Sequence, residues 1–231
     1  MDKVPEEYIK EARELWKEFS HNIKYVNRYF IQKNILDRID GIIKNSVSEP
    51  LSGYEVYRAR IGEFTKEEDL KSPPVGKASN GRGNPRGISY FYTSYDEETA
   101  IGEVRPFKGS KVTVAKFETN QKLKVIDFDI NTINEIVGKT QLNFEERAFL
   151  KILLENLSKP ILPESDLEYI PLQYIIEYIK LKGFGGIRYE SVVSSSHKRN
   201  FLFFDDRTFK LKDIKIYEIN KVEYHFKEII K

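Results

Sequence analysis

The apolar residues of this chain change their spacing once, near residue 50. Before that point they recur every three or four residues, at Ile9, Ala12, Trp16, Phe19 and Ile23, which is the period of a helix with one apolar face. Beyond it, short segments alternate between apolar and polar residues, as half-buried strands do, and helical patterns return between them. Helices at the N-terminus followed by a mixture of strands and helices predict an α+β fold.

The same patterns place the individual elements. Residues 5–45 are predicted to be helical, in one helix or with a second helix carrying Ile35, Ile39 and Ile42, and residues 45–53 form a polar boundary. Asn143 and Glu146 form a capping box for one later helix, and Pro171 opens another that ends at Gly183. A short helix is expected within residues 94–106, and a long loop over residues 66–87. Strands are predicted at residues 54–61, 88–94, 111–118, 122–129, 185–191, 200–205 and 213–219.

These elements divide the chain into two parts. Residues 1–47 form an N-terminal helical annex, and residues 48–231 form the main domain. The apolar stripe of the annex must be covered by the main domain, by another subunit or by a partner. We therefore expect the annex to pack on the main domain or to form a homo-oligomer.

Composition excludes several classes of function. Lys and Arg number 38 against 36 Asp and Glu, so the net charge of +2 does not indicate nucleic-acid binding and any anion site must be local. The absence of cysteine excludes disulfides, thiolate catalysis and cysteine zinc sites. His21, His197 and His225 lie far apart in the sequence, so we expect no metal centre. The N-terminus has no apolar leader and no apolar run reaches ~18 residues, which predicts a cytoplasmic protein without a membrane segment.

The glycine-rich stretch Gly81–Gly87 has two open interpretations. It contains two arginines and could hold a phosphate, but its spacing matches no standard nucleotide-binding loop, and it precedes a strand instead of opening a helix. A plain turn with solvated arginines is the simpler alternative. Arg58 and Arg60 are two residues apart in a strand and so share a face, where they could grip a diphosphate or protect a sheet edge.

Other candidates are weak when taken alone. Glu103 lies on a short helix, where a glutamate usually faces solvent. Ser194–Ser196 precede His197, but no acid lies close enough to complete a triad and no nucleophile elbow is present. Tyr92 could stack on a flat heterocycle or belong to the core.

Five blocks nevertheless occur in a distinctive order. They are Y-R-A-R at residues 57–60, G-R-x-N-P-x-G-I-x-Y-x-Y at 81–92, E-T-A-x-x-E-V-R-P at 98–106, G-G-I-R-Y-x-S at 185–191 and N-x-L-F-F at 200–204. This order resembles the RES-domain family, named for its arginine, glutamate and serine, over about residues 51–204. The resemblance implies a compact mixed sheet with flanking helices, similar to the ADP-ribosyltransferase fold. It also implies a bacterial toxin that consumes NAD⁺ by hydrolysis or phosphorolysis, often paired with an Xre-type antitoxin.

The resemblance also implies a set of site residues. Glu103 matches the family glutamate. Two features depart from the family pattern: one is the charged insertion between the two family arginines, and the other is the helical annex. The remaining matches are Arg58 as the first arginine with Arg60 as an outside possibility, Arg82 in the G-R-x-N block, Tyr92 at the end of the aromatic strand, and Ser191 as the serine with Ser194, Ser195 and Ser196 as fallback candidates.

In the mechanism that follows from these matches, NAD⁺ is the substrate and no cofactor or metal is needed. Glu103 stabilises an oxocarbenium-like ribose, and Arg58 and Arg82 hold the diphosphate. Tyr92 packs on nicotinamide or its ribose, and Ser191 bonds the ribose or the carboxamide. The acceptor stays open among water, inorganic phosphate and a macromolecule. An ADP-ribosyltransferase and a non-enzymatic module that binds nucleic acid or protein through Arg82 and Arg86 are the alternatives.

Overall fold

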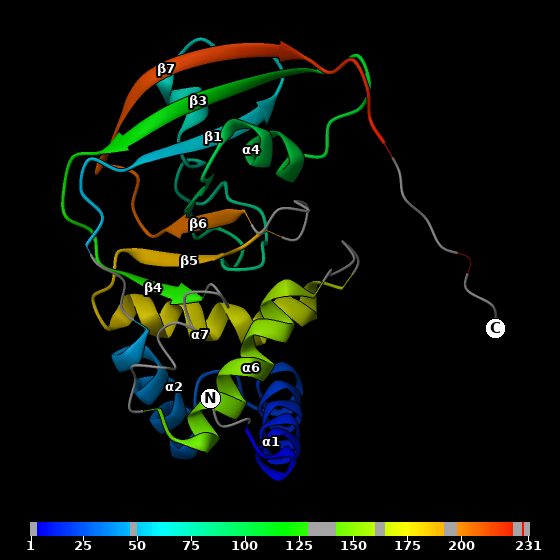
Figure 1. Ribbon diagram of the computed structural model, residues 1–231, viewed down its shortest axis with the longest axis vertical. Coiled ribbons are helices and arrows are strands. Elements are labelled where there is room, and N and C mark those ends of the chain that lie inside the picture. The colour runs from blue at the N-terminus through cyan, green and yellow to red at the C-terminus, as the bar shows by residue number, and fades with distance from the viewer. Residues whose placement is uncertain are drawn as a thin grey trace.

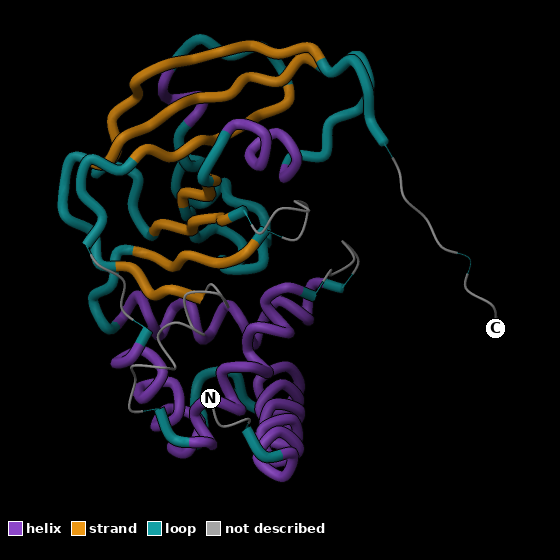
Figure 2. Tube along the Cα trace, in the orientation of Figure 1, coloured by secondary structure: helices purple, strands orange, loops and turns teal. Residues whose placement is uncertain are grey.

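The computed structural model describes residues 4–46, 50–128, 142–159, 165–191, 198–223 and 228. The long helices gather at one end of the molecule, and most strands lie at the other end together with short helices (Figures 1 and 2). The predicted α+β class is therefore confirmed. Among the described residues, no helix is both long and apolar enough to span a membrane.

The strands form one mixed sheet of seven strands. Its order is β4-β5-β6-β2-β1-β3-β7, and every pair is antiparallel except β4 with β5. The strand bounds are β1 Glu55–Ile61, β2 Phe91–Ser94, β3 Lys111–Thr119, β4 Val125–Phe128, β5 Gly186–Glu190, β6 Arg199–Phe203 and β7 Phe209–Glu218.

The helices agree with the predicted pattern in most places. Asn143 and Glu146 form the expected capping box of α6. The helical region predicted over residues 5–45 is two helices, because Asn27 Oδ1 accepts hydrogen bonds from the backbone N–H groups of Tyr29 and Phe30 in a turn between them. The helix bounds are α1 Glu6–Tyr25, α2 Lys33–Asn45, α3 Glu67–Leu70, α4 Glu97–Glu103, α6 Phe144–Ser158, α7 Ile170–Leu181 and the 3₁₀ helix η1 Asp166–Tyr169.

Three local predictions were wrong. Strand β7 begins at Phe209 and not at residue 213, because the buried Phe209 already pairs with Thr119 of β3. Helix α3 lies inside the predicted loop, because Leu70 at its end is fully buried and anchors this turn to the core. Strand β2 begins at Phe91 and not at residue 88. The residues before it are tied to the loop instead of to a neighbouring strand, since Ile88 N–H donates to the Pro85 carbonyl and Ser89 Oγ to the Pro73 carbonyl.

The annex is covered by the main domain. The buried residues of α1 and α2 join those of α6 and α7 in one hydrophobic core, and the ring of Trp16 lies 6.1 Å from that of Phe149 on α6. Figure 1 shows these four helices together below β4 and β5. The apolar stripe is thus satisfied within the chain. The predicted boundary between the annex and the main domain, after residue 47, falls within residues 47–49, which lie outside the described residues. This boundary stays a prediction. The homo-oligomer also stays a prediction.

Candidate active site

The sheet opens between its central strand, β2, and the neighbouring β1. β1 pairs with β3 along its whole length, from Glu55 opposite Glu118 to Ile61 opposite Val112. With β2, by contrast, it shares only the pair Tyr57–Ser94. A cleft of about 480 Å³ lies beside this divergence, a volume within the range of small-molecule sites. Its lining residues are Tyr57, Arg58, Ala59, Ser79, Tyr92, Thr93, Ser94, Ala100, Glu103, Val104, Tyr189 and Asn200.

Glu103 reaches this cleft from the last residue of α4. Asp96 begins the helix by accepting the Thr99 N–H at 2.8 Å, and Thr99 and Ala100 are buried, which orients the helix against the sheet. Glu103 itself is exposed. Its carboxylate is nevertheless held, because Oε1 accepts a hydrogen bond from Ser191 Oγ at 2.7 Å. The predicted family serine and glutamate are therefore in direct contact.

A second donor to Glu103 was not predicted. Asn200 Nδ2 donates to the same Oε1 at 2.5 Å, and Asn200 Oδ1 accepts from Ser94 Oγ at 2.7 Å. Ser94 and Asn200 face each other in the antiparallel pair of β2 and β6, and both are buried. The available signal was an asparagine at the start of the apolar run N-F-L-F-F, since a polar side chain in a buried strand needs a partner.

Arg58 supplies a buried positive charge to the cleft. Its Nη1 donates to the Tyr92 carbonyl at 2.7 Å, and its guanidinium lies 5.5 Å from the centre of the Phe91 ring. Burial, followed by the nearby charge of Arg60, lowers the pKa of Arg58 to about 10, so the group is still a cation at neutral pH. Within the described ranges, Nε has no hydrogen-bond partner and no carboxylate pairs with Arg58. An anionic ligand in the cleft could balance the positive charge of Arg58.

Arg60, the outside possibility, does not line the cleft. Its Nη2 donates to the Lys71 carbonyl at 3.0 Å, which ties β1 to the segment after α3.

Tyr92 joins the cleft to the glycine-rich loop. Tyr92 lines the cleft, and its hydroxyl donates to Asn84 Oδ1 at 2.7 Å and accepts the Gly83 N–H at 3.1 Å. Burial raises the pKa of Tyr92 to about 12. Asn84 also donates to the carbonyls of Ser79, Pro85 and Ile88, so the loop is held rigidly.

Arg82 lies elsewhere than predicted from the loop. Its guanidinium donates to the carbonyls of Leu157 and Lys159 at the end of α6, and it does not line the cleft. A cation there satisfies carbonyls that the helix leaves without partners. In this structure the guanidinium of Arg82 is thus already bound to the end of α6. Binding of the diphosphate by Arg82 stays a prediction.

The remaining candidates are the fallback serines and the three histidines. Ser194–Ser196, His197 and His225 lie outside the described residues. His21 is exposed on α1, with its ring 5.3 Å from that of Tyr25. Across the described ranges, no group of three or more His, Cys, Asp or Glu side chains could hold a metal ion.

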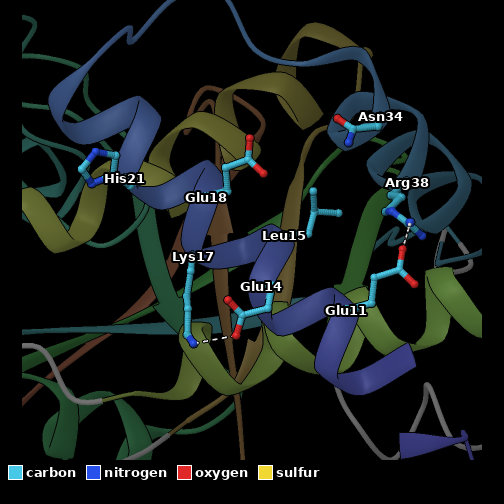
Figure 3. A pocket seen from close by; sticks show the side chains of 8 residues that line it. All are labelled: Glu11, Glu14, Leu15, Lys17, Glu18, His21, Asn34 and Arg38. Carbon is cyan, nitrogen blue, oxygen red and sulfur yellow. Dashed lines mark hydrogen bonds and ion pairs between the residues drawn. The ribbon is translucent and has the colours of Figure 1, made fainter. Parts of the chain in front are cut away.

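Another hollow, of about 600 Å³, lies between α1 and α2 (Figure 3). It is open and strongly charged, but its carboxylates already have partners. Glu14 pairs with Lys17 at 2.8 Å, Glu11 pairs with Arg38 at 3.4 Å, and Glu18 accepts from Gln32 at 2.7 Å. These contacts make it a solvated helix surface and leave the cleft beside β1 as the candidate site.

Comparison with known proteins gives three findings. A family model described as the RES domain matches residues 55–227. No curated protein sequence matches the chain. Among solved structures, the chain is similar to one in the "Crystal structure of the M. tuberculosis MbcT-MbcA toxin-antitoxin complex", with 11% identity over 81% of this chain and 93% of that chain and a TM-score of 0.47. At this identity and TM-score, no residue role is transferred from that protein.

Proposed function

This chain belongs to the RES-domain family, and from that premise we propose that it is an NAD⁺-degrading enzyme. As a glycohydrolase or phosphorylase, it cleaves the bond between nicotinamide and ribose and acts as a bacterial toxin. The observation that carries the proposal is the composition of the cleft. It combines a carboxylate, Glu103, held by Ser191, with a buried guanidinium, Arg58, that no described carboxylate neutralises.

The chemistry needs little beyond these groups. Nicotinamide leaves NAD⁺ as a neutral base that takes the bonding electron pair, so no general acid is required. The bond to the anomeric carbon breaks first and leaves positive charge on the ribose, as in glycoside cleavage. The carboxylate of Glu103 stabilises that charge and orients the ribose hydroxyls or the incoming nucleophile. The nucleophile then bonds to the anomeric carbon and releases its proton to solvent.

Binding of the dinucleotide rests on the other side chains of the cleft. Arg58 holds the diphosphate by charge-assisted hydrogen bonds, since it lines the cleft and is still a cation at neutral pH. Tyr92 offers an aromatic face to nicotinamide or its ribose. The hydroxyl of Tyr92 is fixed by the glycine-rich loop, so the ring needs no reorganisation when substrate enters.

The acceptor decides the product. Water gives ADP-ribose, phosphate gives a phosphorylated ADP-ribose, and a macromolecular group gives ADP-ribosylation. Water and phosphate are favoured here by the family resemblance alone. An Xre-type antitoxin that restrains the enzyme belongs to the proposal on the same ground.

The decisive experiment incubates the purified chain with NAD⁺, with and without phosphate, and identifies the products by mass spectrometry. Release of nicotinamide with ADP-ribose or its phosphate supports the proposal. A labelled NAD⁺ that modifies added protein or nucleic acid favours the transferase. An inert protein that binds nucleic acid in a salt-dependent way favours the non-enzymatic module. Arrest of a bacterial host on induction, and none with Glu103→Gln, tests the toxin role.

A further inference from the structure

We propose that Asn200 is a positioning residue that holds the Glu103 carboxylate in its working orientation without neutralising it. The inference deepens the proposed function and rests on it. It starts from the chain of hydrogen bonds from Ser94 through Asn200 to Glu103. Asn200 opens the N-x-L-F-F block, but the residue matches gave it no role.

The direction of this chain follows from charge. An ionised carboxylate only accepts hydrogen bonds, so the amide atom of Asn200 that faces Glu103 must be the NH₂ group. The atom facing Ser94 is then the amide oxygen, and the Ser94 hydroxyl must donate. The carboxylate thus fixes which end of the amide it meets, and the Ser94 hydroxyl, which can donate or accept, adapts to it.

The two ends of the chain differ in mobility. Asn200 and Ser94 are each 3% exposed and are fixed opposite each other by the backbone register of β2 and β6. Glu103 is an exposed side chain at the end of a short helix and has three rotatable bonds. The rigid pair therefore determines where the mobile carboxylate lies.

Both donors contact the same oxygen. Ser191 Oγ and Asn200 Nδ2 bind Oε1, and within the described part of the chain Oε2 accepts no hydrogen bond. Oε2 is thus left for the ribose. An amide is neutral, whereas a lysine or arginine at this position would cancel the charge that the oxocarbenium needs.

The test compares Asn200→Ala, Asn200→Asp and the parental enzyme, with Thr113→Val as control. Thr113 is a buried residue of β3 whose hydroxyl donates to the Gly62 carbonyl away from the cleft, so the loss of this hydrogen bond measures the effect of destabilisation alone. For Asn200→Ala we expect kcat to fall about 10- to 100-fold, while the Kd for NAD⁺ stays within about threefold because Arg58 remains.

Asn200→Asp provides a readout that a structural role would not give. Two carboxyl groups at this spacing cannot both ionise, so one proton is shared and the pKa of the pair is raised. While the proton is present, Asp donates to Glu103 as the amide did, and activity persists. The activity of Asn200→Asp is lost as the pH rises through the raised pKa. The parental enzyme should show no such loss of activity in this pH range. Besides Tyr57, the other titratable groups that line the cleft are Arg58, a cation at neutral pH, and Tyr92 and Tyr189, neutral phenols whose pKa burial raises.

A crystal structure of Asn200→Ala adds a readout that needs no turnover. We expect the Glu103 side chain to leave its place beside Ser191 or to occupy several rotamers. If the parental enzyme is active and both Asn200 variants match Thr113→Val at every pH, the positioning role is overturned and the proposed function stands. If the parental protein leaves NAD⁺ intact, the proposed function fails, and the position of Glu103 in the Asn200→Ala crystal decides the positioning role by itself.

Discussion

Replacing Glu103 by glutamine removes one charge and little else. The glutamine oxygen can still accept from Ser191 Oγ and Asn200 Nδ2, which both contact Oε1, and the amide nitrogen takes the place of Oε2. The side chain thus keeps its shape and both hydrogen bonds. Any loss of turnover in this variant reports the negative charge.

The size of the effect follows from electrostatics. A unit charge at about 4 Å from the anomeric carbon contributes about 4 kcal/mol at an effective dielectric constant of about 20. Glu103 is exposed in the free protein, so solvent screening lowers this contribution. A remaining value of about 2.7 kcal/mol corresponds to a fall of about 10²-fold in the single-turnover rate. NAD⁺ affinity should persist because Arg58 is unchanged.

The assay is a single-turnover measurement of nicotinamide release together with an NAD⁺ dissociation constant. Glu98→Gln is the matched control, since Glu98 lies on the same helix, is 87% exposed and pairs with Lys198 outside the cleft. Circular dichroism checks the fold of each variant. A Glu103→Gln protein that turns over at the parental rate refutes the electrostatic role.

Three further outcomes are expected. Arg58→Ala should raise the Kd for NAD⁺ about 10- to 100-fold, as measured by calorimetry. Arg86 is an exposed arginine on the loop, and Arg86→Ala should leave the Kd unchanged. Equal effects of the two substitutions would contradict the role of Arg58 in binding the diphosphate. Arg82→Ala should lower the unfolding free energy by about 1–2 kcal/mol because two carbonyls at the end of α6 lose their donor; an unchanged urea midpoint contradicts this. Trp16→Ala should lower the free energy of unfolding by about 3–5 kcal/mol because the annex shares its core with α6. Leu181→Ala, at an 80% exposed position, should change the free energy of unfolding by close to zero. A small decrease for Trp16→Ala would show that the annex is loosely attached.

The local structure was largely readable from the sequence. Apolar periodicity predicted the helices within residues 5–45, the Asn143–Glu146 pair predicted the start of α6, Pro171 predicted the start of α7, and alternation predicted most strands. Such signals work because helix caps and strand alternation depend on residues a few positions apart. Where a distant contact decided the local conformation, as at the buried Leu70 of α3, the prediction from sequence was wrong.

The site required the tertiary structure. Family motifs indicated Glu103 and Ser191, but only the fold brings them to 2.7 Å across 88 positions of the chain. Asn200 was missed because its partners, Ser94 and Glu103, lie about a hundred residues away and meet it through the register of β2 and β6. Arg82 shows the converse, since a loop arginine that suits a phosphate lies instead on the end of α6. Sequence patterns specify which side chains are available, whereas strand register and helix packing decide which of them meet.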